Sequence, residues 1–301
     1  MTRVEIARRR LRFSSTVSVL IGLAAMLGAA PARSLTVTPT TNPADLADAL
    51  NASGLTINSV SLVNGADGQF GTYTDFEAPP ITIHDGVVLS SGLVSGTPAP
   101  ADPILDYPQP SNDMATSGTA EFDAYGPGHI ENFDSSNDVA ALLVSFSLDD
   151  ASQIQFDFIF GSVEYPFWTS DFTDAFLVFL DGTDITNQIT FDANGLPVQV
   201  GVSFANLETT ADQNTAFADP HGLVRSLTTT SALLSAGDHT LLFEVGDVND
   251  HILDSAAFIT NLRAGEDDEG TEPTPEPGTL TLLAVALACV GLRRPRKGRT
   301  A

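Results

Sequence analysis

The strongly acidic composition of this chain of 301 residues excludes some kinds of partner. Its 38 Asp and Glu residues outnumber its 13 Lys and Arg residues, and the formal net charge at pH 7 is −25. Ten of the 13 basic residues lie near the two ends, so only Arg33, Arg225 and Arg263 stand among the 37 acidic residues in between. We expect no nucleic acid and no anionic membrane surface as a partner, because phosphate groups bind to basic surfaces.

The hydrophobic content and the single cysteine narrow the class of protein further. With 43% hydrophobic residues, the chain can form a core in one large domain or two small ones. Its one cysteine, Cys289, lies in an apolar run near the C-terminus, so the main part of the chain has no disulfide bond. Crowded carboxylates repel one another, and bound divalent cations relieve this repulsion, which makes calcium the expected cofactor.

Residues 1–32 have the three parts of a signal peptide. A basic start precedes an apolar run over residues 17–30 and the sequence Ala30-Pro31-Ala32, whose small residues suit cleavage after Ala32. We predict export through the secretory translocon. A pair of arginines also suits a twin-arginine signal, and an uncleaved membrane anchor is an alternative that the short apolar run disfavours.

One short helix is predicted at the start of the main domain, residues 33–265. Asn42 and Pro43 suit an N-cap followed by the first helical residue. Leu46 and Leu50 share one face at a spacing of four, and Gly54 ends the pattern.

All regular structure after this helix is predicted to be strand. The run over residues 153–160 is the clearest, because Phe156, Phe158 and Phe160 alternate with other residues and give the strand one core face. Many short strands without helical periodicity indicate an all-β, jelly-roll-like β-sandwich. Residues 92–137 are predicted to be a long loop. The eight predicted strands are residues 55–63, 81–90, 141–148, 153–160, 174–180, 198–204, 239–245 and 256–262.

Two groups of carboxylates form a candidate calcium site. The first group is Glu164, Asp171 and Asp174, and the second is Asp247, Asp250 and Asp254. If the last strand lies beside the strand containing Phe158, the two groups meet at one end of the sandwich, where calcium takes six to eight oxygen ligands. Acidic clusters also arise from composition alone and then form a solvated face, and Asp247 has the further alternative of capping a turn.

Aromatic residues beside Glu164 suggest a second kind of site. Tyr165 and Trp168 could stack on sugar rings, which would make the domain a carbohydrate-binding module. Core packing is the alternative for both residues, and we expect it for Phe167.

Enzymatic function has little support in the sequence. The five histidines show no HExxH spacing, and Ser162 lacks a GxSxG motif. A pair formed by Glu164 with Asp174 or Asp254 would suit a polysaccharide hydrolase only across a sugar cleft. We therefore expect a non-enzymatic protein.

The C-terminal segment has the organisation of a sorting signal. Residues 266–277 are an acidic, proline-rich linker that ends in Pro275-Glu276-Pro277, residues 278–292 are apolar, and residues 293–301 are basic. The basic tail is expected to stay in the cytoplasm, with the main domain outside. The segment resembles the PEP-CTERM sorting signal of Gram-negative bacteria. This resemblance implies transient anchoring by a transmembrane sorting helix and cleavage by an exosortase-type membrane protease.

The main domain resembles the choice-of-anchor L family of extracellular β domains. The resemblance lies in residues 86–92 (GVVLSSG), 158–180 (FIFGSVEYPFWTSDFTDAFLVFL) and 246–259 (GDVNDHILDSAAFI). It implies an extracellular location. With the predicted signals, it favours an exported cell-surface or matrix protein in adhesion, biofilm or exopolysaccharide organisation. Its expected partners are extracellular polysaccharide and other surface proteins.

Overall fold

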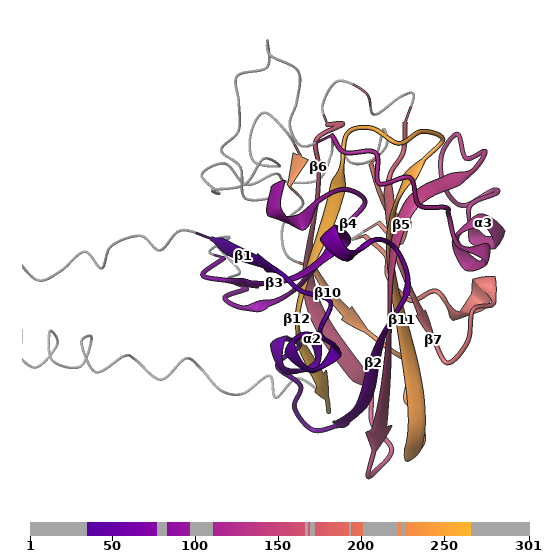
Figure 1. Cartoon of the computed structure of the whole chain (residues 1–301). Coiled ribbons are helices and arrows are strands. Elements are labelled where there is room, and N and C mark those ends of the chain that lie inside the picture. The colour runs from indigo at the N-terminus through magenta and orange to yellow at the C-terminus, as the bar shows by residue number, and fades with distance from the viewer. Residues whose placement is uncertain are drawn as a thin grey trace, which may run out of the picture.

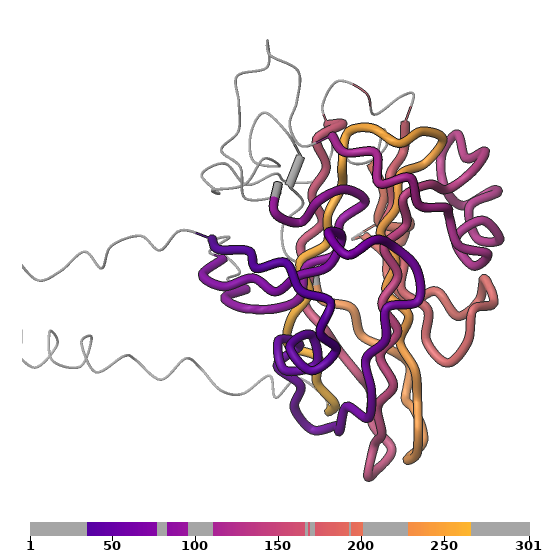
Figure 2. The backbone as a smooth tube through the Cα atoms, in the orientation of Figure 1, coloured from indigo at the N-terminus to yellow at the C-terminus, as the bar shows by residue number. Residues whose placement is uncertain are grey.

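A computed structural model of the chain shows a two-layered arrangement of strands (Figures 1 and 2). It describes residues 35–76, 83–96, 111–165, 168, 172–192, 194–200, 222–223 and 227–265. Among these residues, no helix is long and apolar enough to cross a membrane. Several predictions lie outside the described residues, namely the signal peptide with Ala30 and Ala32, Phe167, Asp171, the linker with Pro275, Glu276 and Pro277, the sorting helix and the basic tail.

The strands form two antiparallel sheets, which confirms the predicted β-sandwich. The first sheet has the order β1-β3-β4-β12-β6-β10, with β9 also paired to β6, and the second has the order β2-β5-β11-β7-β8. The strands of the first sheet are β1 (Thr36–Pro39), β3 (Phe70–Thr74), β4 (Gly86–Ser90), β6 (Ile154–Ser162), β9 (Gly222–Leu223), β10 (Leu227–Thr230) and β12 (Ser255–Ala264). Those of the second are β2 (Thr56–Asn64), β5 (Ser136–Leu148), β7 (Ala175–Leu180), β8 (Val198–Gln199) and β11 (Gly237–Val248).

All eight predicted strands have a counterpart among the described residues, although residues 81–82 and 201–204 of two of them lie outside these residues. Four of the described strands were not predicted. These four are β1, β3, β9 and β10, each with five residues or fewer. In β3, Gly71 obscured the pattern because glycine has a low strand propensity. The structure shows why glycine is present, since a Cβ atom at Gly71 would lie 2.8 Å from the carbonyl oxygen of Thr38 in β1.

Aromatic residues of β6 and β11 dominate the core between the sheets. Phe156, Phe158 and Phe160 all point into this core, as their alternation predicted, and Phe156 meets Phe243 edge to face at 5.2 Å. The outer face of β6 is also partly covered, because Ile159 belongs to a second buried cluster on that side. A third cluster covers the outer face of the second sheet.

Helix α2 (Pro43–Ala49) occurs where the sequence predicted it. The side chain of its N-cap, Asn42, accepts a hydrogen bond from the amide of Ala44 at 3.1 Å. The helix ends earlier than predicted, at Ala49, with Leu50 as its C-cap. Gly54 instead serves a close contact, since a Cβ atom there would lie 2.6 Å from the carbonyl oxygen of Ala264.

A second helix, α3 (Ala120–Tyr125), corrects the prediction that only strands and turns follow α2. It lies within the predicted loop 92–137, and its six residues are too few to show helical periodicity. Thr119 caps it by accepting a hydrogen bond from the amide of Phe122 at 3.2 Å. The structure also contains the short 3-10 helices η1 (Asp67–Gln69), η2 (Val94–Gly96) and η3 (Ile185–Asn187).

A buried histidine joins the end of β7 to the start of β11. His239 lies 2.7 Å from a carboxylate oxygen of Asp181 through Nδ1 and 2.8 Å from the carbonyl oxygen of Ser235 through Nε2. Both partners are acceptors, so the doubly protonated imidazolium satisfies both. Burial alone lowers the pKa of His239, but these acceptors together raise it above 6.5.

This raised pKa predicts a loss of stability with rising pH. The protonated ring stabilises the fold below its unfolded-state pKa, and the contribution disappears as pH rises through the folded-state pKa. We expect the stability difference between wild type and His239→Gln to shrink over that range when unfolding by urea is measured at a series of pH values. A difference that stays constant with pH would contradict the assignment.

Candidate functional site

Pairing of β12 with β6 brings the two predicted acidic groups together. Ser255 of β12 is the register partner of Ser162 of β6, and Asp254 and Glu164 lie just beyond these two residues. The amide of Val163 donates to the carbonyl oxygen of Asp254 at 3.3 Å, which holds the two segments side by side. The last strand, β12, therefore lies beside β6, the strand that contains Phe158, as expected.

The second sheet supplies two more carboxylates at the same end. Ala175 of β7 is the register partner of Gly246 of β11, so Asp174 and Asp247 lie beside this pair. Asp247 lies within β11 rather than in the loop before the last strand, because β11 extends beyond the predicted residue 245. The hydroxyl of Ser255 donates to Asp174 Oδ2 at 2.7 Å and thereby links the two sheets at the site.

Four of the predicted carboxylates are fully buried, but they differ in their partners. Asp254 accepts hydrogen bonds at 2.7 Å from both the amide and the side chain of Asn112. Asp174 accepts from Ser255 and from the amide of Val248. Among the described residues, neither side-chain oxygen of Asp247 has a hydrogen-bond partner, and Glu164 Oε1 has none either. The residue with the weakest sequence support, Asp247, is thus fully buried, with the side chains of Ser91 and Asp174 as near neighbours.

The electrostatics of the cluster favour the binding of protons or of a metal cation by its carboxylates. Burial, followed by the neighbouring carboxylates, raises the pKa of Glu164 and of Asp247. Burial likewise raises the pKa of Asp174 well above its ordinary value, although the hydrogen bond from Ser255 opposes this change. Arg263 is the only Lys or Arg among the described residues, and it pairs with Asp157 at 3.2 Å. No lysine or arginine of the described part therefore neutralises the cluster.

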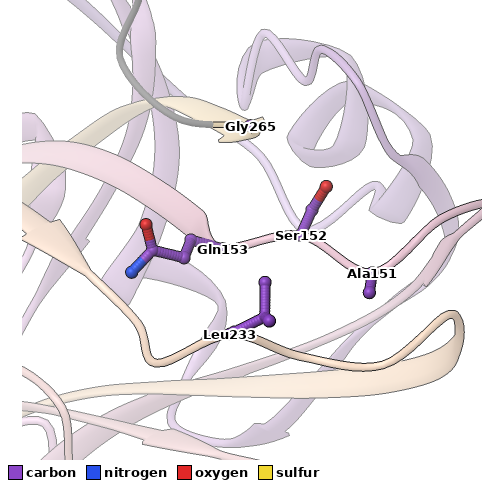
Figure 3. A pocket seen from close by; sticks show the side chains of 5 residues that line it. All are labelled: Ala151, Ser152, Gln153, Leu233 and Gly265. Atoms are coloured by element: carbon purple, nitrogen blue, oxygen red, sulfur yellow. The ribbon is translucent and has the colours of Figure 1, made fainter.

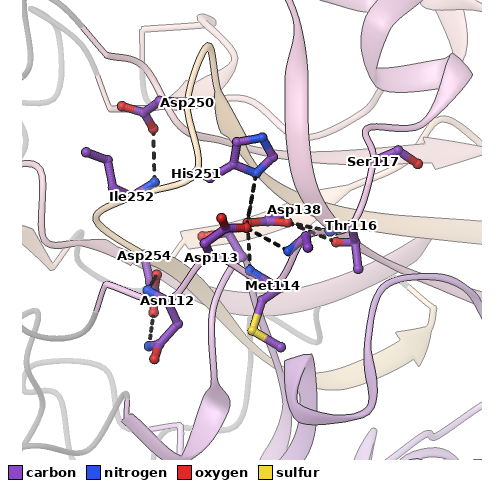
Figure 4. Close-up of polar contacts among 12 residues, drawn as sticks. Asn112, Asp113, Met114, Thr116, Ser117, Asp138, Asp250, His251, Ile252 and Asp254 are labelled. Carbon is purple, nitrogen blue, oxygen red and sulfur yellow. Dashed lines mark hydrogen bonds and ion pairs between the residues drawn. The ribbon is translucent and has the colours of Figure 1, made fainter.

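The β11–β12 loop carries Asp250 and His251, which Figure 4 shows together with Asp138 and Asp254. Asp250 is half-buried, and its charge raises the pKa of Glu164. Burial raises the pKa of Asp254 to about 6, and the charge of Asp138 adds to this. His251 Nδ1 lies 3.1 Å from Asp138 Oδ2 and 3.7 Å from Asp113 Oδ1.

The sequence analysis missed Asp113, Asp138 and His251. Their ligand atoms lie within 4.8 Å of one another, the one such group among the described residues. Asp138 is fully buried and accepts hydrogen bonds from the amides of Met114 and Thr116. No sequence signal joins these residues, because Asp138 and His251 are 113 positions apart. Cation binding by the predicted cluster requires its side chains to draw closer together.

The predicted aromatic pair is partly exposed beside the cluster. Tyr165 is half-buried and packs against the core between the sheets. Trp168 is also half-buried, packs against the second buried cluster, and donates its amide to the carbonyl oxygen of Glu164 at 2.9 Å. Core packing therefore accounts for part of each side chain.

A pocket of about 440 Å³ lies at the opposite end of the sandwich (Figure 3). It is lined by Ala151, Ser152, Gln153, Leu233 and Gly265, none of which is charged. Its position follows from the antiparallel pairing, since Ile154 at the start of β6 faces Ala264 at the end of β12. The acidic cluster and the end of the described chain are therefore separated by the length of β6, roughly 25–30 Å.

Comparison of the C-terminal sequence with known families defines the class of protein. The PEP-CTERM protein-sorting motif matches residues 273–297. The chain is thus an exported surface protein that is processed by an exosortase, as the sequence predicted.

The main domain identifies the family. The Choice-of-anchor L domain model matches residues 36–262, so the chain belongs to this family. No curated protein sequence matches the chain. A solved structure described as a non-crystalline cellulose specific carbohydrate-binding module, CBM28, is 11% identical and covers 64% of this chain and 82% of that chain. Its TM-score of 0.24 supports no inference about this protein.

Proposed function

We propose that this surface protein is a non-enzymatic, calcium-stabilised component of the cell surface or extracellular matrix. Its role is in adhesion, biofilm formation or the organisation of exopolysaccharide, with polysaccharide or other surface proteins as partners. Calcium is structural in this proposal, because it holds together segments of both sheets at one end of the sandwich.

One observation carries the calcium part of this proposal. Asp247 is completely buried, and among the described residues neither of its side-chain oxygens has a hydrogen-bond partner. A buried carboxylate without a partner costs several kcal/mol in a folded protein. Glu164 and Asp174 add further oxygens at the same place, and calcium prefers oxygen ligands of this kind.

The biological role can be tested in cells that produce Asp247→Asn in place of the wild type. We expect normal export but less cell-associated polysaccharide and weaker surface attachment, and chelation of calcium should produce the same defect in wild-type cells. Asp184→Asn, which removes an exposed acidic group, is the matched control for charge. Attachment and polysaccharide retention at the wild-type level in Asp247→Asn cells would contradict the proposed role.

The half-exposed Trp168 supports a second candidate, a carbohydrate-binding module. It is the only tryptophan in the chain, so its fluorescence reports this site alone. Polysaccharide that stacks on the ring should change the emission, and Tyr165→Ala should weaken the response. Release of reducing ends that is lost in Glu164→Gln would instead indicate a polysaccharide hydrolase and would contradict the non-enzymatic proposal.

A further inference from the structure

A second isolated carboxylate, Glu244, lies in the middle of β11. Phe243 and Val245 point into the core between the sheets, so Glu244 points to the outer face of the second sheet. Its register partners are Ala141 in β5 and Leu177 in β7, which both belong to the buried cluster on that face. The side chain is fully buried, although it occupies a position where an apolar residue would pack without a polar cost.

Neither carboxylate oxygen of Glu244 has a hydrogen-bond partner within 3.5 Å among the described residues, although the side chain of Thr119 lies close by. Such groups are rare in native proteins and call for an explanation such as a bound ion or water. The acidic cluster cannot supply a ligand to Glu244. Asp174 and Asp247 lie at the end of β11, whereas Glu244 lies in the middle of this strand on its outer face. The acidic cluster therefore does not account for Glu244.

Helix α3 brings further oxygen groups to Glu244. Phe122 and Tyr125 of α3 pack in the buried cluster on this face. Thr119, Glu121 and Asp123, at the start of the helix, all lie close enough to influence the ionisation of Glu244. Glu121 is half-buried and Asp123 is exposed, so the acidic groups of α3 lie between Glu244 and the solvent.

We propose that Glu244 anchors a second cation site, in which Glu121, Asp123 and the hydroxyl of Thr119 face it from α3. The ligand set contains only oxygen, which suits a hard divalent cation such as calcium. The ligand atoms are not all within 4.8 Å of one another, so Glu121 must turn inward to coordinate the ion. Asp123 Oδ1 accepts hydrogen bonds from the amide and the hydroxyl of Ser136 at 3.0 and 2.7 Å, so only its other oxygen is available to the ion without breaking these bonds. The ion would fasten α3 to the outer face of the second sheet.

The competing explanation for Glu244 is a bound proton. Burial, followed by repulsion from Glu121 and Asp123, raises its pKa to about 8, while the side chain of Thr119 opposes this change. A proton would neutralise Glu244 alone. A divalent cation would also neutralise the two acidic groups of α3, so the two explanations differ in how many α3 residues affect binding.

Calcium titration of the purified full-length protein tests this proposal. We expect Glu244→Gln to bind one equivalent fewer than the wild type, whereas Asp184→Asn keeps the wild-type number. Glu121→Gln, on the surface of α3, should weaken the same equivalent without changing the core. Asp247→Asn should remove a different equivalent, the one bound by the acidic cluster. If the acidic cluster binds no calcium, the test of the Glu244 site is unaffected.

Terbium, which takes the same oxygen ligands as calcium, adds a local readout. Tyr125 lies on α3 in the same buried cluster, so excitation of tyrosine should sensitise terbium bound near Glu244. The emission should fall in Glu244→Gln and by a similar amount in Tyr125→Phe, which keeps the calcium equivalents of the wild type. Emission sensitised by Tyr165 and Trp168 beside the acidic cluster should remain in both variants. If Glu244→Gln and Glu121→Gln retain every calcium equivalent and the tyrosine-sensitised emission, Glu244 holds only a proton and the proposal is wrong.

Discussion

Calcium should raise the melting temperature of the protein, and a chelator should lower it. A ligand that binds only the folded state at 100 times its Kd stabilises that state by about 2.7 kcal/mol. In a domain of this size, each kcal/mol changes Tm by about 2–4 °C, so the expected rise is about 5–10 °C. The rise can be measured by calorimetry of the full-length protein with and without calcium.

The variant Asp247→Asn separates calcium binding from other effects of charge. We expect it to lose the larger part of the calcium-dependent rise, because the buried carboxylate becomes a neutral amide. In chelator it should melt above the wild type, since the amide removes the repulsion from Asp174 and the cost of burying a charge. This reversal of order between the two conditions is specific to a metal site.

The matched control for this experiment is again Asp184→Asn. It changes the net charge by the same amount at an exposed position, so its response to calcium should equal that of the wild type. An equal calcium response in Asp247→Asn and the wild type would show that the cluster holds protons instead of a metal ion.

Truncation of the central aromatic core should have the largest effect on stability. Phe156→Ala is expected to lower the free energy of unfolding by about 3–5 kcal/mol, which combines lost burial with the cavity left behind. Phe156 is fully buried and contacts Phe158 at 6.0 Å and Phe243 at 5.2 Å between ring centroids. Urea unfolding measures this loss as a lower midpoint at an unchanged slope.

Two further variants set the scale for this measurement. Phe156→Leu leaves a smaller cavity, so its loss of stability should lie between those of the wild type and Phe156→Ala. Val63→Ala changes a residue of β2 that is 51% exposed, and its effect should stay within about 0.5 kcal/mol. If Phe156→Ala costs less than Val63→Ala, Phe156 does not lie in the core.

The acidic cluster shows how strand pairing creates a site from distant residues. Glu164 and Asp254 meet because β6 and β12 are neighbours, and Asp174 and Asp247 meet because β7 and β11 are neighbours. The hydrogen bond from Ser255 to Asp174 then joins the two sheets. The sequence analysis could name these carboxylates, since each lies next to a strong strand pattern. That they lie close together could be predicted only by assuming which strands are neighbours.

Asp138 and Glu244 had no such signal in the sequence. Asp138 follows no apolar run, and it becomes buried because the segment from Asn112 to Thr116 folds over it with two amide hydrogen bonds. Glu244 lies inside a strand that the sequence predicted, but the alternation of residues in this strand does not indicate that α3 covers the outer face of the second sheet. Its burial depends on a six-residue helix that is too short to recognise from periodicity.

The sequence by itself determined eight strands of the main domain, helix α2, the core face of β6 and the type of its C-terminal signal. These features depend on local patterns, such as alternating aromatics in β6, the Asn42-Pro43 helix start and the order of motif, apolar run and basic tail. Only the tertiary structure decided which carboxylates are buried together and which lack a partner. Burial and hydrogen bonding of a side chain depend on strands and loops far away in the sequence, and the neighbours of Asp247 and Glu244 show this directly.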